Sequence, residues 1–286
     1  MPRSKKVELR LPLKLTAAQR NVLAELRPRL TARLKLDEPN ARMAEFTVAE
    51  LAAIKSKSQA AMNKAGNGVE RRLMRFILEA ADSAIGESQS LPPEQTVFQF
   101  KITVLESHPP IWRRIQVKDC TLDELHEHIQ TAMGWTNSHL HQFIVDGQRF
   151  GDPELMEEDF EEMGYADSTT TRISTIVPKD RPGFRLNYEY DFGDSWEHEV
   201  LFEGVVRAGS KVKYPVCVEG ARACPPEDCG GIWGYADFLE AIRDARNPEH
   251  EEMLEWIGGY FDPEAFNPAR ATKSMRKGLP DWRRFF

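Results

Sequence analysis

An α+β fold is predicted for this chain of 286 residues, with a mixed β-sheet, packed helices and a preceding all-helical region. Three observations predict it. Apolar residues recur at helical spacing in residues 1–85, alternation of period two begins near residue 96, and one well-capped helix follows the first two strands. The order β-β-α-β of these later elements favours a β-grasp-like arrangement of the sheet.

Residues 1–85 predict three amphipathic helices, at 15–34, 46–66 and 68–86. In the second of these, Thr47 precedes Glu50 by three residues, which is the spacing of a capping box. The polar, proline-containing stretch 86–95 indicates a linker. We therefore expect three parts: a helical region 1–85, a linker 86–95 and an α+β domain 96–286.

The α+β domain is expected to contain a helix at 121–134. Thr121 and Glu124 form a second capping box, Gly134 supplies the C-terminal cap, and Leu122 and Leu125 open the apolar face. Residues 152–167 are expected to form an acidic loop. The remaining predicted elements are strands at 97–105, 111–118, 139–151 (a hairpin), 171–177, 184–192 and 196–206, and helices at 235–245 and 248–259.

Composition narrows the class of protein. The chain is 41% hydrophobic and 29% charged, which is typical of a globular protein. No stretch approaches the ~18 consecutive apolar residues of a membrane-spanning helix, and the basic start lacks the apolar segment of a signal peptide. We therefore expect a cytoplasmic protein with no membrane partner, whose four cysteines stay reduced.

The charge is divided unevenly along the chain. Residues 1–90 carry 17 Lys and Arg against 10 Asp and Glu, whereas the whole chain has a net charge of −7. A basic region of this kind can bind DNA, which makes residues 1–90 a candidate nucleic-acid contact. Alternatively, the basic and acidic parts of the chain attract each other.

The stretch YEYDFGDSWEHEV, residues 188–200, predicts two strands joined by a tight turn. Period-two alternation places Trp196 and His198 on the apolar face of the second strand. His198 is then either a buried histidine bonded to the backbone or a metal ligand or acid–base group. Asp191 lies on the polar face of the first strand and Asp194 lies in the turn, and both carboxylates can face a ligand.

His139 and His141 are spaced two residues apart. If both belong to one strand, their imidazoles point to the same face, where they can hold a metal or an anionic ligand. The alternative is a pair of hydrogen-bonded or surface histidines. Trp135 and Phe143 flank the pair, which suggests a partly enclosed site.

Three cysteines lie close together in the segment CPPEDCGGIWGY and just before it. Cys217, Cys224 and Cys229 would need a fourth ligand to hold zinc, and His198 is the candidate. Simple burial of the three thiols is the alternative. In the same segment, Glu227 and Asp228 either cap backbone amides in the turn or face a ligand.

Several catalytic signatures are absent from the sequence. It contains no G-x-x-x-x-G-K-[ST], G-x-G-x-x-G, H-E-x-x-H or G-x-S-x-G motif. P-loop, dinucleotide-binding, zincin and nucleophile-elbow chemistries are therefore excluded in their usual forms.

The sequence resembles the plasmid pRiA4b ORF-3-like family. The resemblance covers residues 95–270 and rests on five segments: YEYDFGDSWEHEV, CPPEDCGGIWGYADFLEAI, GWTNSHLHQF, RFGDPE and EMLEWIGGYFDPEAFN. It implies an α+β fold and an association with plasmids and insertion elements, where some members carry a transposon-resolvase label. Residues 1–90 are similar to a helical extension of some bacterial members. Ser195 is a poor recombinase nucleophile, because Asp191 and Asp194 beside it repel a phosphate.

We therefore expect a binding or adaptor module linked to mobile elements, whose partner is a protein or a small molecule. Its ligand pocket would be lined by His139, His141, Asp191, Asp194, Trp196, Glu227 and Asp228. The alternative functions are a metal-assisted hydrolase that uses the same residues and a DNA-binding protein that uses residues 1–90.

Overall fold

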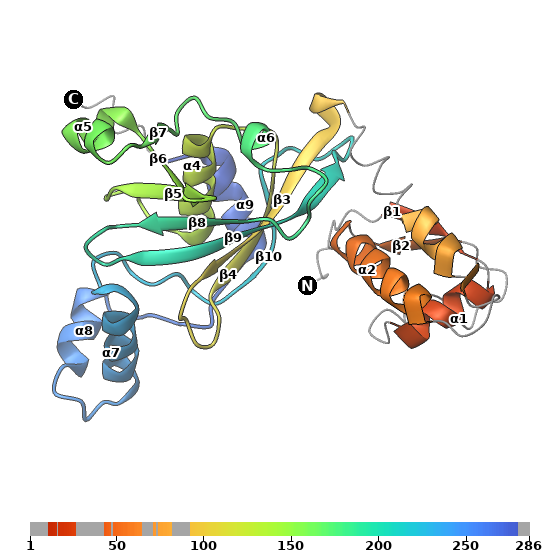
Figure 1. The fold of residues 1–286 in the computed structure, drawn as a ribbon. Helices are drawn as coiled ribbons and strands as arrows, with labels where there is room; N and C mark the ends of the chain where they lie inside the picture. The colour runs from red at the N-terminus through yellow and green to blue at the C-terminus, as the bar shows by residue number, and fades with distance from the viewer. Residues whose placement is uncertain are drawn as a thin grey trace. The chain divides into compact units, whose positions relative to one another are not determined.

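The computed structural model of the chain describes residues 11–15, 17–26, 43–46, 48–64, 71–72, 74–81 and 92–279. The chain divides into two compact units. The first comprises Met1–Val97, Pro178–Gly183 and Glu203–Ser210, and the second comprises the remaining residues. The second unit combines a large mixed sheet with helices, which confirms the predicted α+β class (Figure 1).

The described part of the first unit contains a two-stranded sheet and helices. Strands β1 (Leu11–Lys14) and β2 (Met43–Phe46) pair in antiparallel fashion, and α1 (Ala17–Leu26) and α2 (Val48–Lys64) follow one after each strand. Residues 74–81 are also helical. The predicted helices are confirmed within these bounds, whereas the two strands were not predicted. The predicted caps at Thr47 and Gly66 and the linker residues 86–91 lie outside the described residues.

The core of this unit is small and apolar. The apolar side of each helix faces this core, so the residues spaced at i, i+3 and i+4 in the sequence are buried together. Its buried members are Leu15, Leu23, Leu51, Ile54, Ile77 and Ala81.

The second unit is organised on an eight-stranded sheet in the order β10-β4-β3-β9-β8-β5-β6-β7. Strands β6 and β7 pair in parallel, whereas the pairs β10–β4, β4–β3, β9–β8, β8–β5 and β5–β6 are antiparallel, so the sheet is mixed. The strands are β3 (Thr96–Val104), β4 (Trp112–Val117), β5 (His141–Val145), β6 (Gln148–Gly151), β7 (Ala166–Asp167), β8 (Arg185–Tyr190), β9 (Trp196–Arg207) and β10 (Val216–Ala221). The β-grasp detail stays a prediction.

Helices α4 (Leu122–Met133) and α9 (Pro268–Lys277) pack against each other on one face of the sheet (Figure 1). The side chain of Arg113, on β4, is buried and bonds to the end of α4 and to β10. Its Nε donates to the carbonyl of Ala132 at 3.0 Å and its Nη1 donates to the carbonyl of Ala221 at 2.8 Å. The guanidinium also lies over the ring of Phe266. This one cation therefore ties the end of α4 to β10, its hydrogen bonds offsetting part of the cost of its burial.

Aromatic side chains fill the centre of the sheet. The rings of Phe100 and Phe202 lie 5.6 Å apart, and Phe98 stacks beside Phe100 at 6.4 Å. On β9, Trp196 and Phe202 are almost completely buried, as the predicted alternation requires. Burial of each such ring stabilises the fold by roughly 2–3 kcal/mol.

Two predictions along this unit are wrong. Residues 153–162 form helix α5 (Pro153–Glu162) and not an acidic loop, because Pro153 suits the first helical turn and Asp152 Oδ1 accepts from the N–H of Glu154 at 2.9 Å. Residues 173–176 form the short helix α6 (Ile173–Ile176) and not a strand. Asp119 holds this segment, since its carboxylate accepts from the N–H of Ser174 at 3.1 Å.

Three further elements differ from the expectation. Strand β10 was not predicted, and neither was α9, which Asn267 caps by accepting from the N–H groups of Ala269 and Arg270. Helix α7 (Gly231–Arg243) begins four residues before the predicted start at Tyr235, directly at the second glycine of the Gly230–Gly231 pair. Helix α8 (His250–Trp256) follows α7 and packs against it (Figure 1).

No helix in the described part of the chain is long and apolar enough to cross a membrane.

The predicted capping box of α4 gives a test of the local fold. The Thr121 hydroxyl accepts from the Glu124 N–H at 3.1 Å, and the Glu124 carboxylate accepts from the Thr121 N–H at 2.8 Å. Thr121→Ala should lower the free energy of unfolding by about 1 kcal/mol, measured by urea denaturation, because the Glu124 N–H loses its side-chain acceptor. Thr121→Ser keeps the hydroxyl and should behave like the parent; an equal loss in both variants would contradict the cap.

Candidate functional site

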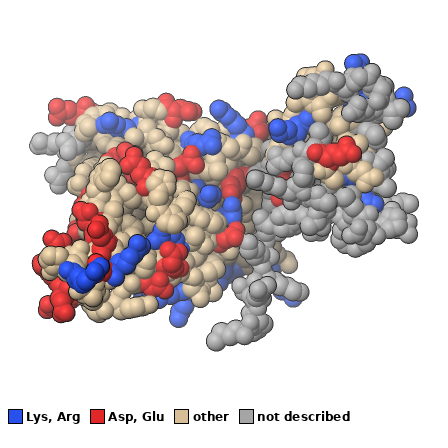
Figure 2. All heavy atoms as spheres, turned by 90° about the horizontal axis from the view of Figure 1, so that it is seen from below, with Lys and Arg blue, Asp and Glu red and all other residues tan. Residues whose placement is uncertain are grey.

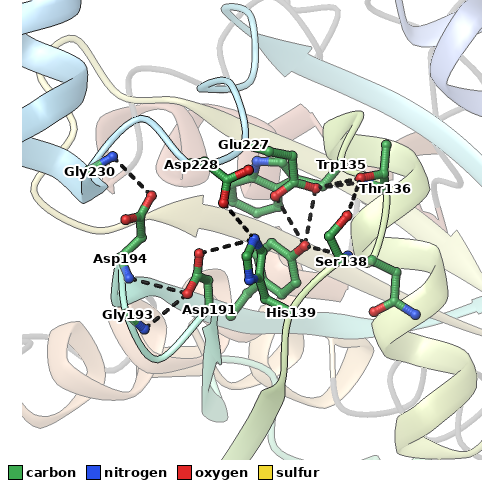
Figure 3. Close-up of polar contacts among 12 residues, drawn as sticks. Trp135, Thr136, Ser138, His139, Asp191, Gly193, Asp194, Glu227, Asp228 and Gly230 are labelled. Carbon is green, nitrogen blue, oxygen red and sulfur yellow. Dashed lines mark hydrogen bonds and ion pairs between the residues drawn. The ribbon is translucent and has the colours of Figure 1, made fainter.

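Three loops of the second unit meet at one polar cluster (Figure 3). They are the loop from α4 to β5, the turn from β8 to β9, and the loop from β10 to α7. His139 Nε2 lies 2.9 Å from Asp228 Oδ1 and 3.5 Å from Asp191 Oδ2. Within the described residues, this is the one group of three or more His, Cys, Asp or Glu side chains whose donor atoms all lie within 4.8 Å of one another.

The backbone of the β8–β9 turn fixes the Asp191 carboxylate. Asp191 has a left-handed φ of 59°, and its Oδ1 accepts from the N–H of Gly193 at 2.9 Å and of Asp194 at 3.3 Å. Aspartate tolerates this conformation because its short side chain bonds the backbone two residues ahead. With Oδ1 held by amides, Oδ2 is directed to His139.

The β8–β9 turn touches the loop before α7 at a point where only glycine fits. Asp194 Oδ2 accepts from the N–H of Gly230 at 3.1 Å. A Cβ on Gly231 would lie 2.3 Å from the carbonyl oxygen of Asp194, and the φ of Gly231 is +67°. Both the space and the left-handed backbone therefore require glycine. The double glycine of the sequence is explained by this close approach.

Glu227 and Asp228 have different partners within the protein. Glu227 Oε1 accepts from the Thr136 N–H at 2.8 Å and from the Tyr190 hydroxyl at 3.1 Å. Burial, and then the Glu227 charge, raise the pKa of Tyr190 well above its usual range. Glu227 therefore joins the loops, whereas Asp228 faces His139.

The expectation that His139 and His141 share one face is wrong. Strand β5 begins at His141, which is paired with Tyr190, so His139 lies outside the ladder in the loop. A left-handed residue, Asn137 with φ 60°, turns the chain just before. His141 instead stacks on His126 of α4, with ring centroids 3.4 Å apart and an angle of 4° between the planes. Period-two alternation fails here because residue 139 precedes the strand.

His126 belongs to a closed cycle of buried hydrogen bonds. Its Nε2 lies 2.7 Å from Asn137 Oδ1, which can only accept, so this nitrogen carries the proton and Nδ1 accepts from the Tyr188 hydroxyl at 2.8 Å. Gln130 Nε2 donates to the same hydroxyl at 3.0 Å, and Gln130 Oε1 accepts from the Asn137 N–H at 3.1 Å. His126 was not among the predicted residues, although its position four residues after Leu122 places it on the buried face of α4.

The buried histidines are neutral. Burial lowers the pKa of His126 and of His198 to about 4, and it also lowers the pKa of His141 well below its usual range. His198 Nδ1 lies 2.9 Å from the carbonyl oxygen of Trp196, so Nδ1 is the protonated nitrogen. His141, His198 and Trp196 therefore lie in the core, and of the predicted pocket residues the structure brings together His139, Asp191, Asp194, Glu227 and Asp228.

Among the described residues, the three clustered cysteines and His198 do not come together as one set of metal ligands. The group whose ligand atoms lie that close is His139, Asp191 and Asp228. Cys217 on β10 is held beside α9, since its N–H donates to Thr272 Oγ1 at 2.9 Å. Burial raises the pKa of the Cys217 thiol to about 11 and that of Cys229 to about 12. Among the described residues, the predicted zinc ligands therefore stay separate.

Comparison with known proteins places the chain in a family. The sequence profile described as "Plasmid pRiA4b ORF-3-like protein" matches residues 96–270, which is more than half of the chain. The chain belongs to the plasmid pRiA4b ORF-3-like family. Every residue of the His139–Asp191–Asp228 cluster lies inside the part that the family profile matches.

Two relatives support the family assignment. "Uncharacterized protein y4hQ" of Sinorhizobium fredii is 36% identical over 192 residues, which cover 66% of this chain and 95% of the relative. The crystal structure of the protein of unknown function MM3350 from Methanosarcina mazei Go1 has a TM-score of 0.55 and 35% identity, covering 61% of this chain and 97% of that protein. The pRiA4b ORF-3-like part of the chain is thus similar to nearly the whole length of both relatives.

The neutral buried histidines predict a pH-dependent stability. Their pKa is about 6.5 when unfolded and lower when folded, so the unfolded state binds more protons as the pH falls. Stability should therefore be complete above about pH 6.5 and fall toward pH 4, by up to about 1.4 kcal/mol per pH unit for each histidine.

Urea unfolding at pH 7, 6 and 5 measures this slope. His126→Gln should reduce the slope by removing one titrating group, whereas Asn187→Gln, at an exposed position and with no titrating group removed, should leave the slope unchanged. A slope that is the same in the parent and in His126→Gln would show that this histidine is not the source.

Proposed function

We propose that the protein is a binding module that holds one divalent cation at His139, Asp191 and Asp228. The observation that carries the proposal is the meeting of three donor atoms from three separate loops around one point. Cation binding would fix the relative positions of the three loops, so that the ion becomes part of the surface offered to a partner. The partner is a protein or a small molecule with an anionic or carbonyl oxygen.

The distances suit a metal ion. Nitrogen and oxygen ligands bind divalent transition metals at about 2.0–2.2 Å, which places neighbouring ligand atoms roughly 3.0–3.5 Å apart. The separations from His139 Nε2 to Asp228 and Asp191 are 2.9 Å and 3.5 Å. His139 Nε2 is buried and makes no well-aligned hydrogen bond, so its lone pair is not committed to a partner within the described residues.

The donor set and its exposure favour Mn²⁺ or Zn²⁺ with coordination positions left open. One imidazole and two carboxylates suit these ions better than Ca²⁺, which prefers oxygen alone. The side chain of Asp228 is 69% exposed, that of His139 is 29% exposed and that of Asp191 is 10% exposed. A partner can therefore reach the ion from the Asp228 side.

The surrounding carboxylates favour binding over catalysis. Glu227 accepts from Thr136 and Tyr190, and Asp194 accepts from the Gly230 amide. A general base needs a lone pair directed at a substrate or a water, and these two oxygens are directed at the protein itself. Asp228 is the one carboxylate of the site that is mostly exposed.

On the face of the α+β unit that Figure 2 shows, Lys and Arg side chains are interspersed with Asp and Glu. This mixed charge does not favour a broad nucleic-acid contact on that face.

The free state of all four cysteines supports a reducing cytoplasm as the site of action.

A metal-assisted hydrolase is the second candidate, and the exposed side of the cluster is the observation that favours it. An ion held by three protein ligands keeps positions for a water and a substrate oxygen, which is the arrangement of catalytic metal sites. The ion would lower the pKa of the bound water and supply the nucleophile.

Titration with Mn²⁺ tests the binding module. Mn²⁺ is chosen because it prefers carboxylate and imidazole to the thiols of Cys224 and Cys229. The full chain should bind one equivalent, measured by calorimetry and by the loss of the free Mn²⁺ signal in electron paramagnetic resonance. Asp228→Asn should weaken binding at least about tenfold, because an exposed anionic ligand becomes neutral with little change in shape.

Asp237→Asn provides the matched control, since Asp237 is exposed on α7 and lies outside the cluster. Its affinity should equal that of the parent chain. The proposal fails if Mn²⁺ does not bind at about 1 mM, or if Asp228→Asn binds as tightly as the control.

Hydrolysis assays separate the two candidates. With Mn²⁺ or Zn²⁺ present, we expect no turnover of p-nitrophenyl phosphate, bis-p-nitrophenyl phosphate or p-nitrophenyl acetate above that of Asp228→Asn with the same ion. Turnover that is lost in Asp228→Asn and kept in Asp237→Asn would support the hydrolase and overturn the assignment as a binding module alone.

A further inference from the structure

A second, apolar cavity lies between the β3–β4 loop and helix α7, and the cation cluster does not use it. Its volume is about 570 Å³, within the range of small-molecule sites. One wall is a stripe of α7 at the spacing i, i+3, i+4, i+7, namely Ile232, Tyr235, Ala236 and Leu239. Pro109 and Ile111 belong to the opposite wall. The cavity is therefore shaped by a rigid helix and a short loop.

Two polar side chains of the cavity lining, Tyr235 and Arg222, are placed to bind a ligand. Tyr235 is 4% exposed, and its buried hydroxyl has no hydrogen-bond partner. An unpaired buried hydroxyl costs about 1–3 kcal/mol, which a ligand that accepts a hydrogen bond from it would recover. Burial raises the pKa of Tyr235 to about 12, so the hydroxyl remains a donor at neutral pH.

Arg222 supplies positive charge at the same cavity. Its guanidinium is nearly buried, with Nη1 3.3 Å from the carbonyl oxygen of Pro109 and Nη2 3.1 Å from Glu264 Oε1. The Glu264 side chain is 69% exposed. If a ligand carboxylate replaces the Glu264 carboxylate, Arg222 stays paired with an anion, and the displaced Glu264 side chain turns to solvent. Arginine also matches the planar carboxylate with two donors.

We infer that this cavity binds a small apolar monocarboxylate, with the ligand carboxylate between Arg222 and the Tyr235 hydroxyl and its hydrocarbon part against Ile232 and Leu239. Glu106 also lines the cavity, but at the end formed by Arg222 and Tyr235 a cationic ligand would face the guanidinium, and a fully apolar ligand would leave the hydroxyl unpaired. The exposed indole of Trp233, beside the cavity on α7, provides a fluorescent reporter.

The test uses the full chain and three probes: phenylacetate, 4-phenylbutyrate and octanoate. Small ligands of this size bind with dissociation constants on the order of 1 mM or below, so titrations to about 10 mM are required. Saturation-transfer NMR and tryptophan fluorescence should detect at least one probe. The amide of that probe should bind about tenfold more weakly or not at all, because it lacks the charge that Arg222 recognises.

Two variants should move the affinity in opposite directions. Tyr235→Phe keeps the ring and removes the donor, so binding should weaken about tenfold. Glu264→Gln removes the competing carboxylate, so binding should tighten severalfold. A merely apolar cavity would respond to neither change, and that result would overturn the inference.

A further pair of variants locates the ligand. Ala236→Trp, at an exposed position that lines the cavity, should abolish binding by filling it, whereas Asp237→Trp, the next exposed position on α7, should not. Asp228→Asn should leave carboxylate binding unchanged, so failure of this inference is distinguishable from failure of the cation site. Absence of binding by all three probes, or equal binding in Ala236→Trp and Asp237→Trp, would refute the cavity as their site.

Discussion

The approach of Gly231 to the carbonyl of Asp194 is the constraint on which the rest of the site depends. This contact leaves no room for a Cβ, so two chain segments more than thirty residues apart meet backbone to backbone. Asp194 secures the meeting by accepting from the Gly230 amide at 3.1 Å. Once these segments are joined, Asp228 stands opposite Asp191, and helix α7 begins directly after the contact. The glycine pair thus positions both a carboxylate cluster and a helix.

A second layer of polar contacts holds the third loop. Glu227 bonds Thr136 and Tyr190, and below them the cycle of Gln130, Tyr188, His126 and Asn137 is closed within the core. Each neutral member of the cycle has a donor and an acceptor at the correct atom, which reduces the cost of burying polar groups. The α4–β5 loop therefore presents His139 from a rigid base.

The two proposed ligand sites share one loop. Arg222 lines the apolar cavity at the start of the segment that leads to α7, and Asp228 faces His139 near its end. Loops held on rigid elements commonly carry binding residues, because their backbone can adopt the left-handed conformations that special side-chain directions need. Arg222 and Asp228 both have such a φ, 68° and 59°. In the segment CPPEDCGGIWGY, predicted as a possible zinc loop, the ligand of the proposed cation site is the Asp228 carboxylate and not a thiolate.

The sequence by itself determined the α+β class, the capped helix at 121–134, the central strands and the apolar side of β9 that carries Trp196 and His198. These depend on local spacing, capping chemistry and alternation, which neighbouring residues define. Only the tertiary structure decided which candidates meet. It separated His139 from His141, because a strand begins between them, and it left the cysteines apart from His198. It joined His139, Asp191 and Asp228, whose approach depends on a glycine contact between loops distant in sequence, and no periodicity encodes such a contact.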